Sequence, residues 1–137
     1  MQGYNCIAVY NKDKNKFLFC RRTKDPYDGL YNFLGGKIEP GENKLEAAYR
    51  ELKEESGISK QDIKLNHMMD FTYYNQDCYV EVYVGVLEYD INLVEEKHPL
   101  VWIDDKEDFF DTARFAGEGN IGHMVQQIKI YGMGYTV

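Results

Sequence analysis

The chain has 137 residues, and its 44% hydrophobic and 28% charged residues are close to average globular usage, which excludes wholesale disorder. Sixteen basic residues against 23 acidic ones give a net charge of −7, which makes the chain a poor nonspecific binder of nucleic-acid polymers. We expect a single domain over residues 1–137. The apolar stretches fall short of the ~20 residues of a membrane span, and the N-terminal sequence does not resemble a signal peptide, so we expect a cytoplasmic protein without a membrane partner.

The predicted elements alternate between strands and helices along the chain. Runs of β-prone or alternating apolar residues predict strands at 4–10, 16–20, 63–74, 78–89 and 100–103, of which the first two form a hairpin. Apolar residues at helical spacing, from Ile121 to Ile128, predict a C-terminal helix that ends at Gly132. This interleaving indicates an α/β or α+β protein with a mixed sheet.

A helix over 44–56 is the most strongly marked element. Asn43 can cap its N-terminus, with Glu46 three residues later as in a capping box, and Gly57 supplies the expected stop. Three apolar side chains fall on one stripe that can pack on a sheet: Leu45, Ala48 and Leu52.

Three glutamates share an adjoining strip of this helix about 100° wide, because Glu51, Glu54 and Glu55 stand at positions i, i+3 and i+4. Like charges at these spacings repel by roughly 0.2–0.5 kcal/mol per pair, and the helix macrodipole disfavours anions near the C-terminal end. A solvated acidic face is one interpretation. The position against the dipole favours a divalent-cation site instead, and hard carboxylate ligands indicate Mg²⁺, with Mn²⁺ as a substitute.

A glycine turn and this helix together form a specific motif over residues 36–58. The pattern runs Gly36, five residues, Glu42, seven residues and then Arg50-Glu51-Leu52-Lys53-Glu54-Glu55-Ser56-Gly57-Ile58. This pattern resembles the Nudix box, with its loop–helix–loop, at every defined position, and the order of strands and helices over nearly the whole chain also resembles a Nudix domain.

The resemblance implies a Nudix fold, an α/β/α arrangement in which a mixed sheet lies between helices. It also implies a Mg²⁺-dependent hydrolase, and the MutT-like branch of the family implies a nucleoside triphosphate substrate that yields nucleoside monophosphate and pyrophosphate. An oxidised nucleotide resembling 8-oxo-dGTP is among the candidates. The resemblance places the metal on the backbone carbonyl of Gly36 and on the carboxylates of Glu51, Glu54 and Glu55.

The resemblance also implies the residues that support the reaction. Arg50 and Glu42 would brace the loop–helix–loop and fix the orientation of the carboxylates. A carboxylate must take the proton of the attacking water, and family members use either a box glutamate or a later one. The later candidates are Glu95 and Glu96, of which Glu96 stands at the MutT-like interval before Trp102; an ordinary exposed loop is the alternative for this pair.

Two basic residues are candidate phosphate contacts. Arg22 ends the second predicted strand, where an arginine pair resembles that of MutT-like enzymes, and a guanidinium fork suits phosphate. Lys37 lies in the glycine turn at the start of the box. Ordinary surface charge is the alternative for the arginine pair.

Candidate base contacts lie before and after the box. Asn32 and Phe33 resemble a base-reading segment of oxidised-purine hydrolases, because an amide can read a purine edge and an aromatic face can stack on a base. Glu118 and Asn120, with Phe115 as a stacking partner, occupy a second region where such enzymes read the base. The two phenylalanines could instead be core residues, and Asn120 could cap the C-terminal helix.

Other functions remain open at this point. Tyr74 lies where dinucleoside polyphosphate hydrolases carry a tyrosine, so that substrate class or another nucleoside diphosphate derivative is an alternative. A non-catalytic Nudix module that senses a nucleotide is a further one, although such modules usually lose the box glutamates that this chain retains. A small nucleotide is the expected partner, and the sequence leaves both a monomer and a homodimer open.

Overall fold

A computed structural model describes residues 1–131. The six strands of this part are β1 (Gln2–Tyr10), β2 (Lys16–Arg21), β3 (Tyr31–Asn32), β4 (Asn66–Tyr73), β5 (Cys78–Val86) and β6 (Leu100–Asp104). The helices are α1 (Lys44–Ser56) and α2 (Asn120–Ile130), and a 3-10 turn, η1 (Tyr74–Gln76), joins β4 to β5. The strands form one mixed sheet in the order β3-β2-β1-β5-β4, and β6 pairs with β2.

Strand β1 is central to this sheet. It runs parallel to β5 along its whole length, from Gln2 opposite Cys78 to Tyr10 opposite Val86. Its hairpin with β2 is confirmed, but the register joins only Tyr10 to Phe17, because the two strands diverge beyond the turn. The space beside β1 is taken by the segment at 34–37, which forms antiparallel bridges to β1. The glycine turn of the box therefore lies directly against the central strand.

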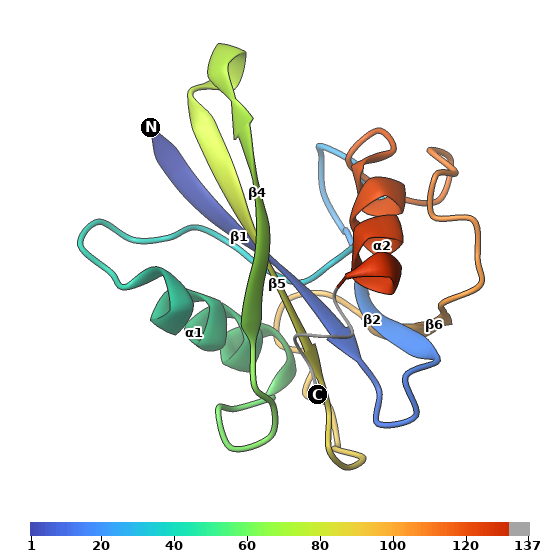
Figure 1. The fold of residues 1–137 in the computed structure, drawn as a ribbon. Coiled ribbons are helices and arrows are strands. Elements are labelled where there is room, and N and C mark those ends of the chain that lie inside the picture. Colours follow the sequence, from blue (N-terminus) through green and yellow to red (C-terminus); the bar gives the residue numbers. More distant parts are fainter. Residues whose placement is uncertain (132–137) are drawn as a thin grey trace.

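The two helices lie on opposite sides of the strands, as Figure 1 shows for α1 and α2. Side chains of β1 alternate between them: Ile7 and Val9 belong to the buried cluster that includes α1, and Cys6 and Ala8 belong to the cluster that includes α2. The expected α/β/α arrangement with a mixed sheet is confirmed.

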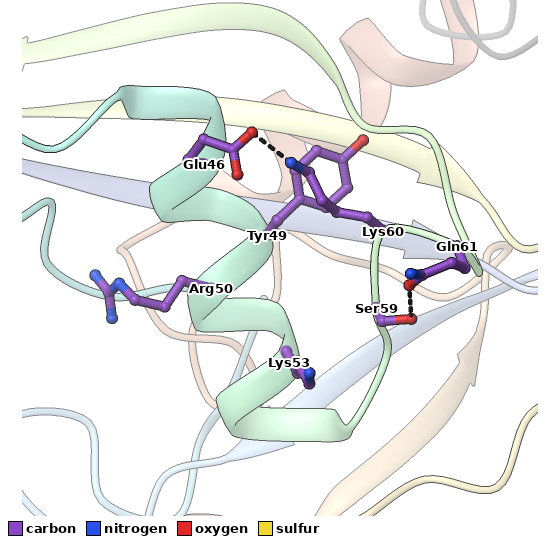
Figure 2. A pocket seen from close by; sticks show the side chains of 7 residues that line it. All are labelled: Glu46, Tyr49, Arg50, Lys53, Ser59, Lys60 and Gln61. Atoms are coloured by element: carbon purple, nitrogen blue, oxygen red, sulfur yellow. Dashed lines mark hydrogen bonds and ion pairs between the residues drawn. The ribbon is translucent and has the colours of Figure 1, made fainter.

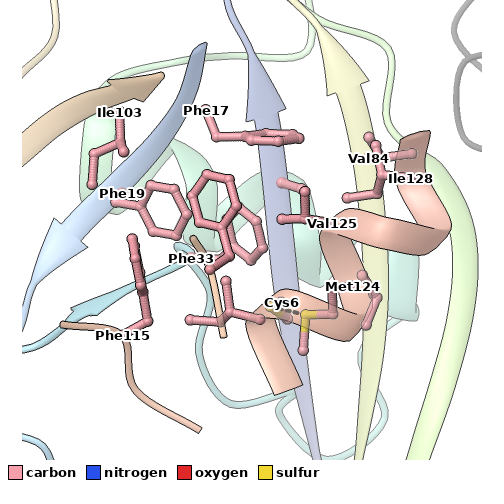
Figure 3. Packing of buried hydrophobic residues seen from close by; sticks show 14 of the residues in the cluster. Cys6, Phe17, Phe19, Phe33, Val84, Ile103, Phe115, Met124, Val125 and Ile128 are labelled. Atoms are coloured by element: carbon pink, nitrogen blue, oxygen red, sulfur yellow. Dashed lines mark hydrogen bonds between the residues drawn. The ribbon is translucent and has the colours of Figure 1, made fainter. Parts of the chain in front are cut away.

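The core on the α2 side is rich in aromatic rings (Figure 3). Phe19 stacks on Phe33 with ring centroids 4.6 Å apart and on Phe109 at 5.6 Å. Phe115 lies 5.4 Å from Phe19, and both rings are fully buried. Such aromatic pairs add roughly 0.5–1.5 kcal/mol each beyond the apolar area that they bury. This cluster ties β2, the 33–34 segment and the loop before α2 into one body.

Most predicted elements are confirmed, with shifts at their ends. The helix at 44–56 is found with the predicted bounds, and the strand expected from 63 begins at Asn66. The two-residue strand β3 is an element that the sequence did not predict. Helix α2 ends at Ile130, and Gly132, its expected stop, lies outside the described residues. Within residues 1–131, no helix is both long and apolar enough to cross a membrane.

Candidate metal and phosphate site

Helix α1 is fixed at both ends by its own sequence. The Asn43 side-chain oxygen accepts the Glu46 N–H at 3.1 Å, and Gly57 adopts a left-handed conformation (φ 81°) that ends the helix. Ala48 and Leu52 are fully buried against the sheet. Leu45, expected on the same stripe, is instead 39% exposed, because it lies in the first turn, beyond the edge of the contact.

The three box glutamates lie where the buried stripe of α1 meets solvent. Glu51 and Glu55 are 5% and 7% exposed, and the Glu54 side chain is 45% exposed. Burial of two carboxylates on one helix is costly unless a cation or hydrogen bonds compensate them. The arrangement therefore differs from a solvated acidic face.

The buried carboxylates are incompletely satisfied by the protein itself. Among the described residues, Glu51 Oε2 has no hydrogen-bond partner. Glu55 Oε2 accepts one long bond, from the Gly35 N–H at 3.3 Å. Burial, with the neighbouring charges of Glu51 and Glu54, raises the pKa of Glu55 to about 7. These are the features of hard oxygen ligands that fit a divalent cation.

The glycine turn lies directly against these carboxylates. A Cβ on Gly36 would come within 2.5 Å of the Glu51 carboxylate, so only glycine allows this approach. Asn5 of β1 holds Gly36 on its other side: the Asn5 N–H donates to the Gly36 carbonyl at 2.9 Å, and the Gly36 N–H donates to Asn5 Oδ1 at 2.9 Å. The proposed metal-ligating carbonyl of Gly36 thus already accepts one hydrogen bond, and its role stays a prediction.

Arg50 joins the loop to the helix, as the box predicts. Its Nε and a terminal nitrogen donate to the two oxygens of Glu42 at 2.6 and 2.9 Å, and the same terminal nitrogen donates to the Lys37 carbonyl at 3.0 Å. Its other terminal nitrogen lies 3.1 Å from Glu51 Oε1 and 3.3 Å from Glu54 Oε2. The guanidinium lowers the pKa of Glu42. A paired fork of this kind fixes the direction of the carboxylates that it contacts.

A pocket of about 590 Å³ opens beside these groups, and Arg50, Lys53, Glu54, Glu96 and Lys97 line it. The pocket thus brings a late glutamate next to a box glutamate, although they are 42 positions apart in the chain. It also supplies three cationic side chains, which suit an anionic ligand.

The structure separates the two candidates for the general base. Glu95 accepts the Leu100 N–H at 2.6 Å, so this carboxylate is used in the turn before β6. Glu96 lines the pocket instead. The geometry favours Glu96, and its catalytic role stays a prediction.

A second pocket, of about 290 Å³, is lined by residues of α1 and of the loop that follows it (Figure 2). It is lined by Glu46, Tyr49, Arg50, Lys53, Ser59, Lys60 and Gln61. Lys60 is paired with Glu46 at 2.5 Å, and Ser59 donates to Gln61. None of Glu51, Glu54 and Glu55 lines this pocket, and four of its polar side chains are paired with one another. It therefore offers less for phosphate chemistry than the larger pocket.

The two candidate phosphate contacts, Arg22 and Lys37, differ in their exposure and in their hydrogen bonds. Arg22 is partly buried, and its Nε donates to the Pro26 carbonyl of its own loop at 2.6 Å. Lys37 is exposed beside the glycine turn, and its carbonyl is held by Arg50. Neither lines the 590 Å³ pocket, so their contact with phosphate stays a prediction.

The candidate base contacts are placed less uniformly. The prediction that Phe33 contacts substrate is corrected, because this ring is 3% exposed and stacks on Phe19 within the core. Phe115 is likewise a core residue at 2% exposed. Asn32 is partly exposed on β3, where it pairs with Cys20.

Asn120 does not act as the cap of α2, since Gly119 occupies the N-cap position and Asn120 is the first helical residue. Its amide donates to the Tyr73 hydroxyl at 2.6 Å, which joins α2 to the end of β4. Glu118, just before it, is exposed with a left-handed backbone (φ 55°). Both remain candidates for contact with a base.

A separate group of possible ligands lies on β4 and β5. One ligand atom from each of His67, Asp70 and Glu81 falls within 4.8 Å of the others. Glu81, however, already pairs with Lys44 at 3.2 Å and accepts the Tyr83 hydroxyl at 2.7 Å. Since these partners compensate its charge, the group is explained as a hydrogen-bonded network.

Sequence reasoning missed two residues of the site. Asn5 lies within a β-prone run, and the only signal was a polar side chain among residues that fill a core. Lys97 follows Glu96, and its charge gave no hint that it lies 3.8 Å from both Glu51 and Glu54. Both depend on contacts between segments that are far apart in the chain.

Known proteins resemble this chain in sequence and in fold. The CTP pyrophosphohydrolase of Escherichia coli (strain K12) is 41% identical over 51 residues, which are 37% of this chain and 38% of that protein. The 8-oxo-dGTP diphosphatase of the same organism is 32% identical over 68 residues, 49% of this chain and 53% of that protein. The chain thus matches about half or less of each relative's length.

A solved structure of a C. elegans Ap4A hydrolase binary complex superposes with a TM-score of 0.76 at 20% identity, and the match covers 98% of this chain and 99% of that one. This likeness concerns the fold. The model of the NUDIX domain matches residues 2–116, which include the whole box. The chain therefore belongs to the Nudix family, and its resemblance to MutT-like hydrolases is confirmed.

Proposed function

We propose that this protein is a Mg²⁺-dependent pyrophosphohydrolase that cleaves a nucleoside triphosphate to a nucleoside monophosphate and pyrophosphate. The observation that carries the proposal is the pair of buried box carboxylates, Glu51 and Glu55, of which Glu51 leaves one oxygen without a hydrogen-bond donor among the described residues. Support also comes from the two relatives whose names specify nucleoside triphosphates as substrates.

The residues assigned to the metal are Glu51, Glu54 and Glu55, with the carbonyl of Gly36. When bound, a divalent cation screens the charge of the phosphates, polarises a phosphoryl oxygen and lowers the pKa of bound water. Mn²⁺ is expected to substitute, because it shares the preference for oxygen ligands.

The other residues orient groups and move a proton. Arg50, held by Glu42, fixes the direction of Glu51 and Glu54. Glu96, which lines the same pocket as Glu54, is the proposed general base that accepts the proton of the attacking water. The water oxygen forms a new bond to phosphorus while the P–O bond of the bridge between the α- and β-phosphates breaks. The departing group, either pyrophosphate or the nucleoside monophosphate, takes the electron pair of the broken bond.

Substrate recognition is the finer part of the proposal. Arg22 and Lys37 are proposed to contact phosphates, and Asn32, Glu118 and Asn120 the base, which an oxidised purine such as that of 8-oxo-dGTP would suit. A dinucleoside polyphosphate is the second candidate substrate, favoured by the fold likeness to an Ap4A hydrolase and by Tyr74, which is 82% exposed. A cytoplasmic location, one domain over 1–137 and a monomer or homodimer stay predictions.

The test is turnover of a panel of nucleoside triphosphates and dinucleoside polyphosphates by the Glu54→Gln variant. Because Gln keeps the shape but removes the ligand charge, we expect kcat to fall by about two orders of magnitude or more. Glu46→Gln is the matched control, since Glu46 is an exposed glutamate of the same helix and pairs with Lys60. It should retain normal turnover.

Products and fold complete the test. Pyrophosphate together with a monophosphate supports the proposed bond cleavage, and the melting temperature of Glu54→Gln should stay close to that of the natural protein. Near-normal kcat in a folded Glu54→Gln variant contradicts the ligand role. Tight nucleotide binding by the natural protein without any product favours a sensor module instead.

A further inference from the structure

Lys97 forms ion pairs with two of the three box carboxylates. Its ammonium lies 3.8 Å from Glu51 Oε2 and 3.8 Å from Glu54 Oε2, between one buried and one exposed glutamate. Arg50 lies 3.1 Å from the other oxygen of Glu51, Oε1, whereas Lys97 is paired with Oε2, the oxygen that lacks a hydrogen-bond donor among the described residues. Its distance is that of an ion pair and exceeds that of a hydrogen bond.

This position conflicts with a divalent cation on the same carboxylates. A metal ion bound by Glu51 and Glu54 would take up their negative charge and repel an ammonium at this distance. The Lys97 side chain is 50% exposed and comes from the loop between β5 and β6, so it can leave without unpacking the core. Lys97 and the metal ion therefore compete for the same two carboxylates, those of Glu51 and Glu54.

A displaced Lys97 stays within reach of substrate. Lys97 lines the 590 Å³ pocket together with Lys53 and the proposed base Glu96. A triphosphate that enters this pocket is strongly anionic, and a flexible ammonium is a suitable contact for its oxygens. The Lys97 side chain can thus pair with the carboxylates in the ligand-free protein and contact the phosphates when metal and nucleotide are bound.

We propose that Lys97 is a phosphate-contacting residue whose ammonium rests on Glu51 and Glu54 until a divalent cation displaces it. This inference rests on the proposed function. Binding of the divalent cation and binding of the nucleotide are then coupled. The cation must break the ion pairs of Lys97 with Glu51 and Glu54, and the lysine that is released can contact the phosphates of the nucleotide. Removal of the charge should strengthen metal binding and weaken nucleotide binding.

The test compares Lys97→Met with the natural protein in two binding titrations. Mn²⁺ alone, titrated by calorimetry or by the electron paramagnetic resonance of free Mn²⁺, should bind about three- to fivefold more tightly, which is the size expected for exposed ion pairs. A non-hydrolysable triphosphate analogue at saturating Mn²⁺ should bind about tenfold more weakly, as expected for loss of a charge-assisted contact. A merely structural effect would move both affinities in the same direction.

Two further variants serve as controls. Lys53→Met removes a cation that lines the same pocket without an ion pair to Glu51 or Glu54 among the described residues, so its Mn²⁺ affinity should stay close to the natural value. Lys97→Arg keeps the charge and should preserve the natural Mn²⁺ affinity. Unchanged or weaker Mn²⁺ binding by a folded Lys97→Met variant overturns the inference.

Mn²⁺ binding by Glu54→Gln separates this inference from the proposed function. If Glu54→Gln and the natural protein bind Mn²⁺ equally well, the metal does not use this glutamate, and the proposed function fails together with the inference. If Glu54→Gln binds Mn²⁺ more weakly while Lys97→Met shows no gain, the metal site stands and the role of Lys97 alone is rejected.

Discussion

At the scale of single residues, the site is built from groups that would destabilise an ordinary helix. Glu55 is largely buried near the C-terminal end of α1, and its surroundings raise its pKa to about 7. A carboxyl group in this state is held ready for a cation at a cost to the metal-free fold. This cost can be measured from the pH dependence of the free energy of unfolding.

Stability of the metal-free protein should depend on Glu55 between about pH 4.5 and 7. The folded pKa of about 7 lies above the ordinary value of 4.5, so in this window the folded state binds more protons than the unfolded one. The contribution of Glu55 to the free energy of unfolding is therefore complete at low pH and is lost as the pH rises through this window.

The measurement is urea unfolding with a chelator, for the natural protein and for Glu55→Gln. The stability of the variant relative to the natural protein should increase from pH 5 to pH 7 and then level off. Glu46→Gln, an exposed glutamate of the same helix, should show no such trend. A constant difference between Glu55→Gln and the natural protein at all pH values contradicts this prediction.

The helix that carries the box glutamates could be predicted from the sequence, whereas the surroundings of the candidate substrate contacts could not. Glu51, Glu54 and Glu55 follow from helix periodicity, which is local. Phe33 could be read as a stacking partner or as core, and only the packing of Phe19 on its face decides for the core. Asn5 could not be assigned at all, because its role depends on the segment that bridges to β1, 31 residues away.

At the scale of elements, α1 determines the geometry of the site because it carries all three box glutamates. Its bounds could be predicted, since both caps lie within the sequence of the helix and its neighbours. Strand β3 could not, because its pairing with β2 and with the segment around Phe115 depends on the whole sheet. The bounds of the helix thus depend on neighbouring residues in the sequence, whereas the short strand depends on pairing with segments that are distant in the chain.

The cap of α1 gives a prediction at this scale. Asn43→Ala should lower the free energy of unfolding by about 1 kcal/mol, because the Glu46 N–H loses its acceptor. Asn43→Ser keeps a capping oxygen and should recover most of the loss. Urea unfolding of the two variants tests this, and equal destabilisation by Ala and Ser would show that the cap oxygen does not matter.

At the scale of the whole molecule, the sheet separates two cores. The buried cluster that includes α1 supports the proposed metal site, and the aromatic cluster that includes α2 lies on the other side of the sheet. A ligand that binds only the folded protein stabilises the molecule as a whole. Metal binding at one side of the sheet should therefore be visible in global unfolding.

Mg²⁺ should raise the melting temperature by roughly 5–10 °C at a concentration about 100-fold above its dissociation constant. Glu51→Gln should lose most of this shift, because the oxygen without a donor is then no longer anionic. Glu46→Gln should keep it. Thermal unfolding with and without Mg²⁺ provides the measurement, and a full shift in Glu51→Gln would place the cation elsewhere.

The compactness of the box has an evolutionary consequence. One continuous stretch, 35–57, together with Asn5, supplies the proposed metal ligands and their support, whereas the candidate base contacts come from separate segments around 32 and 118–120. After gene duplication, mutations in those segments can alter which nucleotide is accepted while the hydrolytic apparatus is inherited intact. Duplicated copies of such a gene can therefore change the nucleotide that they bind more readily than the reaction that they catalyse.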